Sequence, residues 1–509
     1  METLQHLLGG FQIALLPVNL LFAFAGVVIG QLIGVLPGIG PPAGVAILLP
    51  ATFKLNPTSA MIMFAGIYYG AMYGGTITSV LINIPGEAAS VMTTLDGHQM
   101  ARQGRAGPAL GIAAFGSFIA GTIATVILMF FAPWLAGVAL SFGPPEYAAL
   151  MVLAFALVIG LTAASPARGL ASLAAGLFLA VVGVDVMTGL PRFTFGQLPL
   201  LDGMDFVPVA MGIFGIGEVL VSLEDESAGD AGAARLRLAD LFPNRQDWAL
   251  SRVPILRGSL LGFLIGALPG AGATTASMVS YAAERRFSRH PERFGHGAIE
   301  GVAGPESANN AAAVGALVPL LTLGIPGSAT TAVMLGGLLI FGLRPGPLLY
   351  QQHPDYEGGL IASMYIGNAM LVVLNTVFIP VFVAAVRVQK AVLAALIVTF
   401  SIVGVYSLEN SMFSVWLMLL FGGIGFFMKK LQYPPAPLVL ALVLGQTLEM
   451  AVRQSLKMSH GDLGIFISRP LSAALLTVAL AMVVLPALPA LRRRVAGGRK
   501  VPEIPAPQR

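Results

Sequence analysis

The chain has 509 residues, of which 56% are hydrophobic and only 10% are charged. A soluble domain carries about 25% charged residues, so this composition excludes an ordinary globular enzyme and a disordered chain alike. Gly and Pro are abundant, at 61 and 35 residues, yet they lie inside long apolar stretches. Membrane helices satisfy their own backbone groups and tolerate Gly and Pro. The composition therefore predicts an all-α polytopic membrane protein.

The net charge of +4 is too small to indicate a nucleic-acid partner. The largest basic cluster lies within residues 492–500, and the positive-inside rule places that end of the chain in the cytoplasm. The sequence has no cysteine, which excludes disulfides, thiolate metal sites and cysteine nucleophiles. The six histidines are scattered, so we expect no cofactor and no metal beyond a possible coupling ion.

Apolar stretches divide the chain into membrane segments. A bilayer core of about 30 Å needs about 20 apolar residues per helix. On this basis we predict about twelve transmembrane helices, in chain order at 12–35, 57–82, 109–132, 146–164, 169–190, 205–222, 254–268, 358–386, 390–407, 411–428, 434–452 and 471–490. Shorter apolar pieces flank Pro-Gly motifs and are expected to form re-entrant or half helices, at 42–53, 272–284, 311–323 and 328–342.

One long polar segment, residues 224–253, separates the chain into two halves. We expect a first transmembrane half over residues 1–223 and a second over residues 254–491. A cytoplasmic basic tail over residues 492–509 completes the predicted organisation. The N-terminal stretch lacks a basic region and a cleavage site, so it is interpreted as the first membrane segment rather than a signal peptide.

The two halves share two motifs in the same order. Residues 33–44 read IGVLPGIGPPAG and residues 265–276 read IGALPGAGATTA, while residues 82–92 read INIPGEAASVM and residues 323–334 read LGIPGSATTAVM. The two offsets, 232 and 241 residues, are nearly equal, which predicts an internal repeat. A Pro-Gly pair often only ends a helix. Matched breaks in repeated halves, however, are typical of secondary transporters, where they mark a substrate site near the midplane.

The broken helices suggest what the site binds. The N-terminus of a half helix suits a carboxylate, and its unwound carbonyls suit a sodium ion. Small and polar residues gather at the breaks, although helix packing also favours single Ser and Thr residues. The predicted substrate-binding residues are Gly38, Gly40, Asn83, Pro85, Gly86, Ser90, Gly270, Gly272, Thr274, Asn309, Asn310, Pro326, Gly327, Ser328 and Thr330.

Ionisable residues inside a membrane are functional candidates by default. Glu87 and Glu306 adjoin the breaks, and with Thr322 they are the predicted ion-coupling residues. A capping role for Glu87 at a helix start is the alternative interpretation. Carboxylates permit proton coupling, while the hydroxyl- and carbonyl-rich breaks permit sodium coupling, so both ions stay open.

Missing motifs narrow the function further. The sequence contains no Gly-Lys dipeptide, so it has no Walker A loop and no built-in ATPase. It also lacks the metalloprotease and nucleophile-elbow motifs. The chain is therefore not expected to be an enzyme. A passive channel for small anions and, less favoured, an integral-membrane enzyme are the alternatives to a secondary transporter.

Four stretches of this sequence resemble the large membrane subunit of the tripartite tricarboxylate transporters. They are GVLPGIGPPAGVAILLP (34–50), YGAMYGGTITSVLINIPGEAASVMTTLDGHQMARQGRAGPALG (69–111), SYAAERRFSRHPERFGHGAIEGVAGPESANNAAA (280–313) and LGIPGS (323–328). The match follows the chain in order over most of its length. Mild departures from the family pattern occur at Thr76, His98 and Gly304, and they bear on substrate preference.

The resemblance implies a translocating subunit in a bacterial inner membrane. It implies two partners, a small four-helix membrane subunit and a periplasmic solute-binding protein. It further implies symport of carboxylates, such as citrate and related di- and tricarboxylates, driven by a Na⁺ or H⁺ gradient. An elevator-like arrangement, in which a domain holding the broken helices slides against a scaffold, is also implied by the resemblance.

Overall fold

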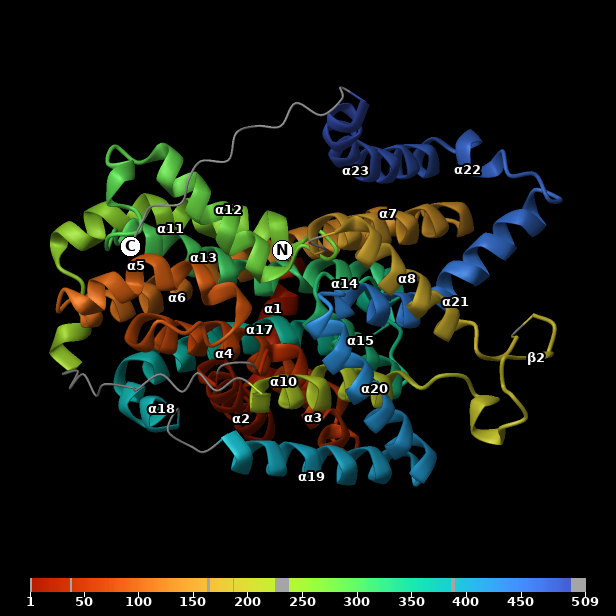
Figure 1. Cartoon of the computed structure of the whole chain (residues 1–509), viewed down its shortest axis with the longest axis horizontal. Coiled ribbons are helices and arrows are strands. Elements are labelled where there is room, and N and C mark those ends of the chain that lie inside the picture. Colours follow the sequence, from red (N-terminus) through yellow and green to blue (C-terminus); the bar gives the residue numbers. More distant parts are fainter. Residues whose placement is uncertain are drawn as a thin grey trace.

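The computed structural model describes residues 2–36, 39–162, 165–185, 187–224, 238–352, 354–385 and 390–495. Within these ranges the chain is almost entirely helical, which confirms the all-α prediction (Figure 1). The first half contains α1 (Glu2–Ala14), α2 (Pro17–Val35), α3 (Pro41–Thr52), α4 (Pro57–Ile82), η1 (Ala88–Ser90), α5 (Val91–Arg102), α6 (Ala106–Ala139), α7 (Pro144–Thr162), α8 (Pro166–Ala180), η2 (Leu198–Leu200), α9 (Phe206–Ala210), the π-helical η3 (Met211–Ile216) and α10 (Gly217–Glu224).

The second half begins after a short turn, η4 (Leu238–Leu241), which lies within the predicted polar linker, as does the start of α11 at Arg245. Its helices are α11 (Arg245–Gly266), α12 (Gly272–Phe287), η5 (Pro291–Arg293), α13 (Glu300–Gly315), α14 (Leu317–Leu323), α15 (Ala329–Ile340), α16 (Pro347–Gln352), α17 (Pro354–Val377), α18 (Ile379–Ala385), α19 (Lys390–Glu409), α20 (Met412–Lys430), α21 (Pro435–Met458), α22 (Ile465–Ser468) and α23 (Pro470–Val495). The predicted tail beyond residue 495 lies outside the described residues.

Eight helices in the described part of the chain are long and apolar enough to cross a membrane, at 17–35, 106–139, 206–224, 245–266, 356–377, 391–408, 412–430 and 435–458. The protein is thus a multi-pass membrane protein by the length and composition of its helices. Predicted spans over α7, α8 and α23 appear among the shorter apolar helices. The figure of about twelve spans stays a prediction.

Several predicted spans have different bounds in the structure. The stretch 358–386 is divided between α17 and α18 at Phe378, and the helix predicted over 254–268 begins at Arg245. The stretch 12–35 is divided between α1 and α2, because Pro17 starts a new helix after Leu16 leaves the helical conformation. The stretch 169–190 ends as a helix at Ala180. Beyond it, Gly183 has a φ of 116°, and the chain forms a short antiparallel hairpin, β1 (Gly183–Val184) with β2 (Pro191–Arg192).

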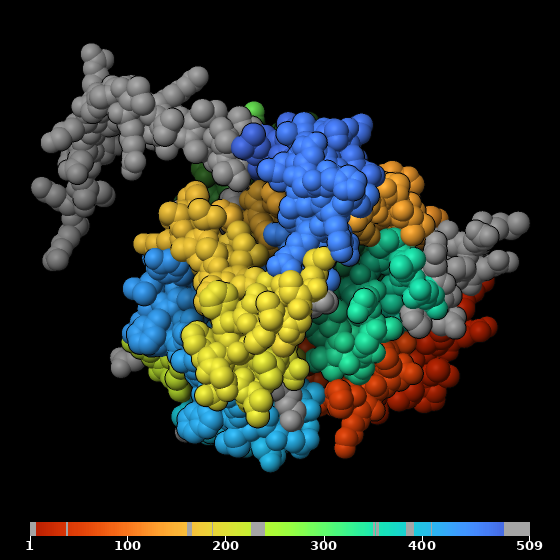
Figure 2. All heavy atoms as spheres, turned by 90° about the vertical axis from the view of Figure 1, so that its right-hand side faces the viewer, coloured from red at the N-terminus to blue at the C-terminus, as the bar shows by residue number. Residues whose placement is uncertain are grey.

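The hairpin segment joins α8 to α9 at one end of the molecule, where it is drawn in yellow beside the blue C-terminal helices (Figure 2). An ion-pair network ties it to α21. Arg453 lies 2.9 Å from Asp185 and 2.6 Å from Glu449, and Arg192 lies 2.7 Å from Glu449. These pairs hold the hairpin against the end of α21.

Two closely packed helix pairs form the centre of the fold. In both pairs, glycines spaced four residues apart let one helix backbone approach the other, as is common in membrane bundles. In the first pair, Gly26, Gly30 and Gly34 of α2 face Met63, Ile67 and Ala71 of α4. In the second pair, Gly258, Gly262 and Gly266 of α11 face Gly304, Ala308 and Ala312 of α13. The glycines are offset by 232 residues and their partners by 241 residues, the same offsets as the two motifs.

The short apolar pieces become short helices. α3, α12 and α15 have 12, 16 and 12 residues, fewer than the ~20 that a full span needs. The predicted piece 311–323 is instead divided between α13 and α14, which part at Ala316. The breaks before α3, α12 and α15 form the candidate site.

Candidate functional site: a cavity between the helix breaks

The breaks of both halves open onto one cavity of about 760 Å³. This volume suits a small organic solute. The walls are mostly apolar, with polar groups at a few positions. From the breaks come Gly40, Pro41, Pro42, Ala43, Glu87, Ala88, Gly270, Ala271, Gly272, Ala273, Thr274, Thr275, Pro326, Ser328, Ala329 and Thr330, and facing them are Tyr68, Met72, Val158, Phe214, Glu218, Met278, Ala332, Lys429, Pro435, Ala436 and Leu440.

Three helices point their N-termini at this cavity. The residues that precede α3, α12 and α15 are Gly40, Ala271 and Ser328, and all three line it. The first four N–H groups of a helix have no partner within the helix, and the positive end of the helix dipole attracts anions. The cavity therefore has the electrostatic character of an anion site without a cluster of basic side chains.

The N-termini differ in the donors they offer. α3 begins with two prolines, which have no N–H, so it contributes mainly its dipole. At α15 a reciprocal capping box joins Ser328 and Thr331, in which the N–H of Thr331 donates to Ser328 Oγ at 3.2 Å. The N–H groups of Ala329 and Thr330 are thus the ones α15 has left for a ligand. α12 starts with small residues and offers its whole first turn.

Glycine conformations shape the second-half break. Gly270 and Gly272 have φ values of 80° and 63°, a region that residues with a side chain rarely adopt. The N–H of Gly270 donates to the carbonyl of Gly327 at 2.9 Å, so the break before α12 is bonded to the break before α15. The two second-half breaks therefore form one unit.

Many residues predicted for substrate binding line the cavity: Gly40, Gly270, Gly272, Thr274, Pro326, Ser328 and Thr330. Of the predicted ion-coupling residues, Glu87 also lines it. One Glu87 oxygen accepts from the N–H of Ala89 at 2.8 Å and so caps η1, while the other has no hydrogen-bond partner in the structure. Both interpretations of Glu87 are compatible with this geometry. Gly38 lies outside the described residues.

Other predicted residues lie beside the cavity and shape the breaks. Asn83 ends α4 in the left-handed conformation, with a φ of 59°, and its side chain is exposed. Pro85 is half-buried in the turn that follows. A methyl group on Gly86 would lie 2.8 Å from Cα of Gly75, and one on Gly327 would lie 2.8 Å from Cα of Ala316. Because they have no side chain, Gly86 lets its break pack against α4 at Gly75, and Gly327 lets its break pack against the backbone at Ala316.

Ser90 contacts neighbouring residues of the first-half break. It is fully buried, and its hydroxyl donates to the carbonyl of Glu87 at 2.8 Å while accepting from Ser79 at 3.0 Å. Thr322 is likewise buried and donates to the carbonyl of Val318 at 2.7 Å, within its own helix. Neither residue lines the cavity.

Glu306 lies in a separate buried polar cluster between α4, α5, α6 and α13. Thr76 donates to Glu306 Oε2 at 2.6 Å, Asn309 donates to the same oxygen at 3.2 Å, and Thr93 donates to Oε1. No Lys or Arg pairs with this fully buried carboxylate within the part of the chain that the structure describes. A carboxylate in this setting needs a proton or a bound cation to be neutralised.

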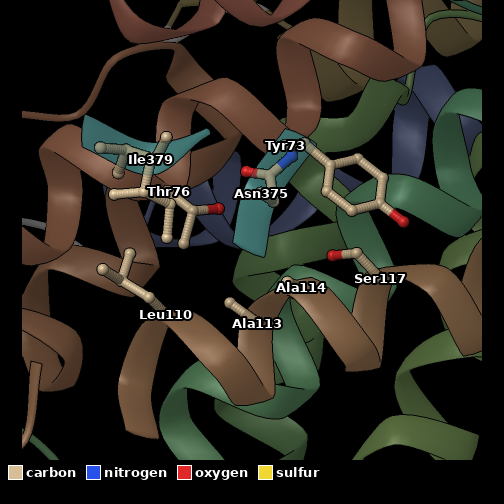
Figure 3. Close-up of a pocket in the computed structure, with 9 residues that line it drawn as sticks. Tyr73, Thr76, Leu110, Ala113, Ala114, Ser117, Asn375 and Ile379 are labelled. Carbon is tan, nitrogen blue, oxygen red and sulfur yellow. The ribbon is translucent and has the colours of Figure 1, made fainter. Parts of the chain in front are cut away.

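Asn310 extends this cluster toward α6. Its amide donates to Ser117 Oγ at 2.7 Å and to Asn309 Oδ1 at 2.7 Å. Its own oxygen is buried and has no hydrogen-bond partner among the residues that the structure describes. A cavity of about 10 Å³, room for about one water, adjoins the cluster. Tyr73, Thr76, Ile77, Leu110, Ala113, Ala114, Ser117, Asn375 and Ile379 line it (Figure 3).

Four residues that the structure places in the main cavity are not among the predicted site residues. Tyr68 donates to Ser328 Oγ at 3.0 Å, and Phe214 belongs to the π-helical segment η3. Glu218 and Lys429 form an ion pair at the cavity wall. A glutamate inside an apolar stretch and a lysine in the last turn of a spanning helix were the available signal.

Apolar spanning helices around a solute-sized cavity are typical of a membrane transport protein. Residues 20–440 match the Tripartite tricarboxylate transporter TctA family, and the chain belongs to that family. It is 47% identical to an uncharacterized 52.8 kDa protein in the TAR-I ttuC′ 3′ region of Agrobacterium vitis, over 97% of this chain and 98% of that protein. It is 43% identical to an uncharacterized protein in the TAR-II ttuC′ 3′ region of the same organism, over 46% of this chain and 96% of that protein. No solved structure matches.

Proposed function

We propose that this protein is the translocating subunit of a binding-protein-dependent tripartite system and carries carboxylate solutes into the bacterial cell by secondary active transport. The observation that carries the proposal is the meeting of three helix N-termini, those of α3, α12 and α15, at one cavity of about 760 Å³. Such ends bind carboxylates through N–H groups and the helix dipole. Membership of the family supports the same substrate class.

The repeat proposed from the sequence is supported by paired contacts. Gly34 and Gly86 contact each other in the first half, and Gly266 and Gly327 contact each other in the second. Asn83 and Gly324, 241 residues apart, both end a helix in the left-handed conformation. We propose that the two halves, residues 1–223 and 254–491, are duplicated units with about twelve spans in total, and that their broken helices move together against a scaffold in an elevator-like cycle.

The driving force is proposed to be a gradient of Na⁺ or H⁺. Glu306 supports this, because a fully buried carboxylate with three neutral donors has to take up a cation or a proton to be neutral. Glu87 is the second candidate, because it lines the cavity and one of its oxygens has no hydrogen-bond partner among the described residues. Thr322 is the least supported of the three, because its hydroxyl is used within α14.

The partners follow from the family. We propose that a small four-helix membrane subunit and a periplasmic solute-binding protein complete the system, that it lies in the inner membrane, and that the basic C-terminus is cytoplasmic. The delivery protein would select the solute, and this chain would move it.

Reconstitution of both membrane subunits in proteoliposomes, with the binding protein outside, tests the proposal. Accumulation of citrate or succinate against its gradient is expected when a Na⁺ or H⁺ gradient is imposed, and collapse of that gradient should stop it without any effect of ATP. Entry that never exceeds the external concentration would instead indicate the passive channel. Chemical conversion of the solute by the purified subunit would indicate the membrane enzyme.

A further inference from the structure

The wall of the cavity also carries charged side chains. Among the described residues that line it, Lys429 alone is positively charged, while Glu87 and Glu218 are acidic. Lys429 and Glu218 pair with each other, and their side chains are 34% and 15% exposed. Glu218 lies in the first turn of α10 and Lys429 in the last turn of α20, and ionisable residues of membrane helices are functional candidates.

The local backbone brings this pair to the cavity. Glu218 follows the π-helical segment η3, and π-helical turns are frequent at functional sites. A methyl group on Gly217 would lie 3.2 Å from the backbone of Gly425, so α10 and α20 approach closely one turn before Lys429. Phe214, one turn before Glu218, lines the same cavity.

The charge balance of the wall argues for a role with an anion. With all three groups ionised, the described side chains that line the cavity include two carboxylates and one ammonium, so their net charge does not attract a carboxylate. Besides the three helix N-termini, the group that attracts it is the Lys429 ammonium, a compact cation with three donors. To use it, the solute has to compete with Glu218 for the same donors.

We infer that Lys429 is a solute-binding residue that exchanges its partner, releasing Glu218 and pairing with one carboxylate of the solute while another carboxylate lies at the helix N-termini. This inference rests on the proposed function and names the side chain that favours solutes with more than one carboxylate. Glu218 acts as the competitor that occupies Lys429 when the cavity is empty.

The chain itself supplies a matched control. Lys430 and Glu224 join the same two helices through an ion pair of 2.6 Å, with side chains 45% and 54% exposed, and neither lines the cavity. Loss of that pair removes a contact between α10 and α20 without removing a cavity charge. The absence of cysteine supplies a direct binding readout, since a single Thr274→Cys substitution places one thiol in the cavity wall.

Membrane vesicles with the two membrane subunits are labelled with a thiol reagent at increasing citrate, succinate or benzoate, and the half-protecting concentration is measured. The cavity double variant, Lys429→Gln with Glu218→Gln, should raise the half-protecting concentration of citrate and succinate about tenfold or more, which corresponds to about 1.4 kcal/mol or more. It should raise that of benzoate much less.

Glu218→Gln alone should lower the half-protecting concentration, because the residue that competes for Lys429 is weakened. The control double variant, Lys430→Gln with Glu224→Gln, should leave the half-protecting concentration unchanged.

The opposite signs of the variants separate binding from support of the fold. If the Lys429–Glu218 pair only joins α10 to α20, Glu218→Gln alone should weaken protection of the thiol by the solute, or the control double variant should act like the cavity double variant. Either result overturns the inference. The inference is also overturned if the solute protects the thiol equally well in the cavity double variant and in the unsubstituted pair. Failure of the complete system, with its binding protein, to accumulate any of the three solutes would overturn the proposed function itself. Normal uptake by that system with no role for Lys429 overturns this inference alone. The amount of each variant in the membrane is measured in parallel.

Discussion

Tyr68 in the first half and Ser328 in the second half are joined by a hydrogen bond of 3.0 Å, across 260 residues of sequence. Tyr68 lies on α4, Ser328 caps α15, and both line the cavity. The bond therefore links the halves at the place where the solute is proposed to bind.

Tyr68→Phe should remove this donor and keep the ring. We expect a loss of about 0.5–1.5 kcal/mol in unfolding free energy and weaker solute binding, because the cap of α15 loses one of its fixed neighbours. Thermal unfolding in detergent and the half-protecting concentration of citrate measure the two effects. An unchanged value for both would show that the bond plays no part in forming the site.

Gly86→Ala and Gly327→Ala should each disturb one helix break. The added methyl would lie within 2.9 Å of backbone atoms of Gly75 or of Ala316 and Gly266, and overpacking of this kind costs about 1–3 kcal/mol. Reduced thermal stability and loss of uptake are expected in both. Gly137→Ala is the control, because its methyl meets no atom within 4 Å; equal damage there would contradict the packing argument.

Asn83 is expected to act through its backbone. Its φ of 59° is costly for Ala but not for Gly, and Gly324 holds the corresponding position in the second half with a φ of 70°. Asn83→Gly should therefore transport normally, while Asn83→Ala should lose about 1 kcal/mol of stability. If uptake is lost in Asn83→Gly with stability intact, the amide itself contacts the solute.

Glu306→Gln should uncouple transport from the ion gradient. The glutamine keeps an oxygen that can accept from Thr76 or Thr93 but cannot bind a proton or attract a cation with a full charge. We expect loss of gradient-driven accumulation and retention of solute exchange in vesicles without a gradient. Gradient-driven accumulation at the unsubstituted level would remove Glu306 from the coupling mechanism.

The ion-pair network of the hairpin predicts a pH dependence of stability. The N–H of Met187 and the guanidinium of Arg453 lower the pKa of Asp185 from 3.8 to about 2. A lowered folded-state pKa stabilises the fold above the ordinary pKa of the group, and that contribution is lost as the pH falls through the folded-state value. Asp185→Asn should therefore lower the melting temperature at pH 6, and the difference should shrink between about pH 4 and pH 2. A difference that is constant with pH would contradict this.

Sequence patterns predicted the polytopic helical fold and half of the cavity-lining residues at the breaks. Gly40, Gly270 and Ser328 were found because Pro-Gly breaks interrupt apolar stretches at fixed spacing, a local signal that survives in one sequence. Tyr68 and Lys429 were missed, because their position depends on contacts between helices hundreds of residues apart. Asn309 and Asn310 were grouped with the substrate site by composition, yet α13 directs them to the Glu306 cluster.

The most direct test of the central claim uses the thiol at position 274 in the otherwise cysteine-free chain. Vesicles containing both membrane subunits are labelled with and without the carboxylate that the complete system accumulates, and Ser141→Cys, at an exposed position outside the cavity, serves as the control. If the solute binds between the helix breaks, the carboxylate slows labelling at position 274 and leaves position 141 unaffected. Equal labelling rates at position 274 with and without that solute would contradict a carboxylate site between the helix breaks.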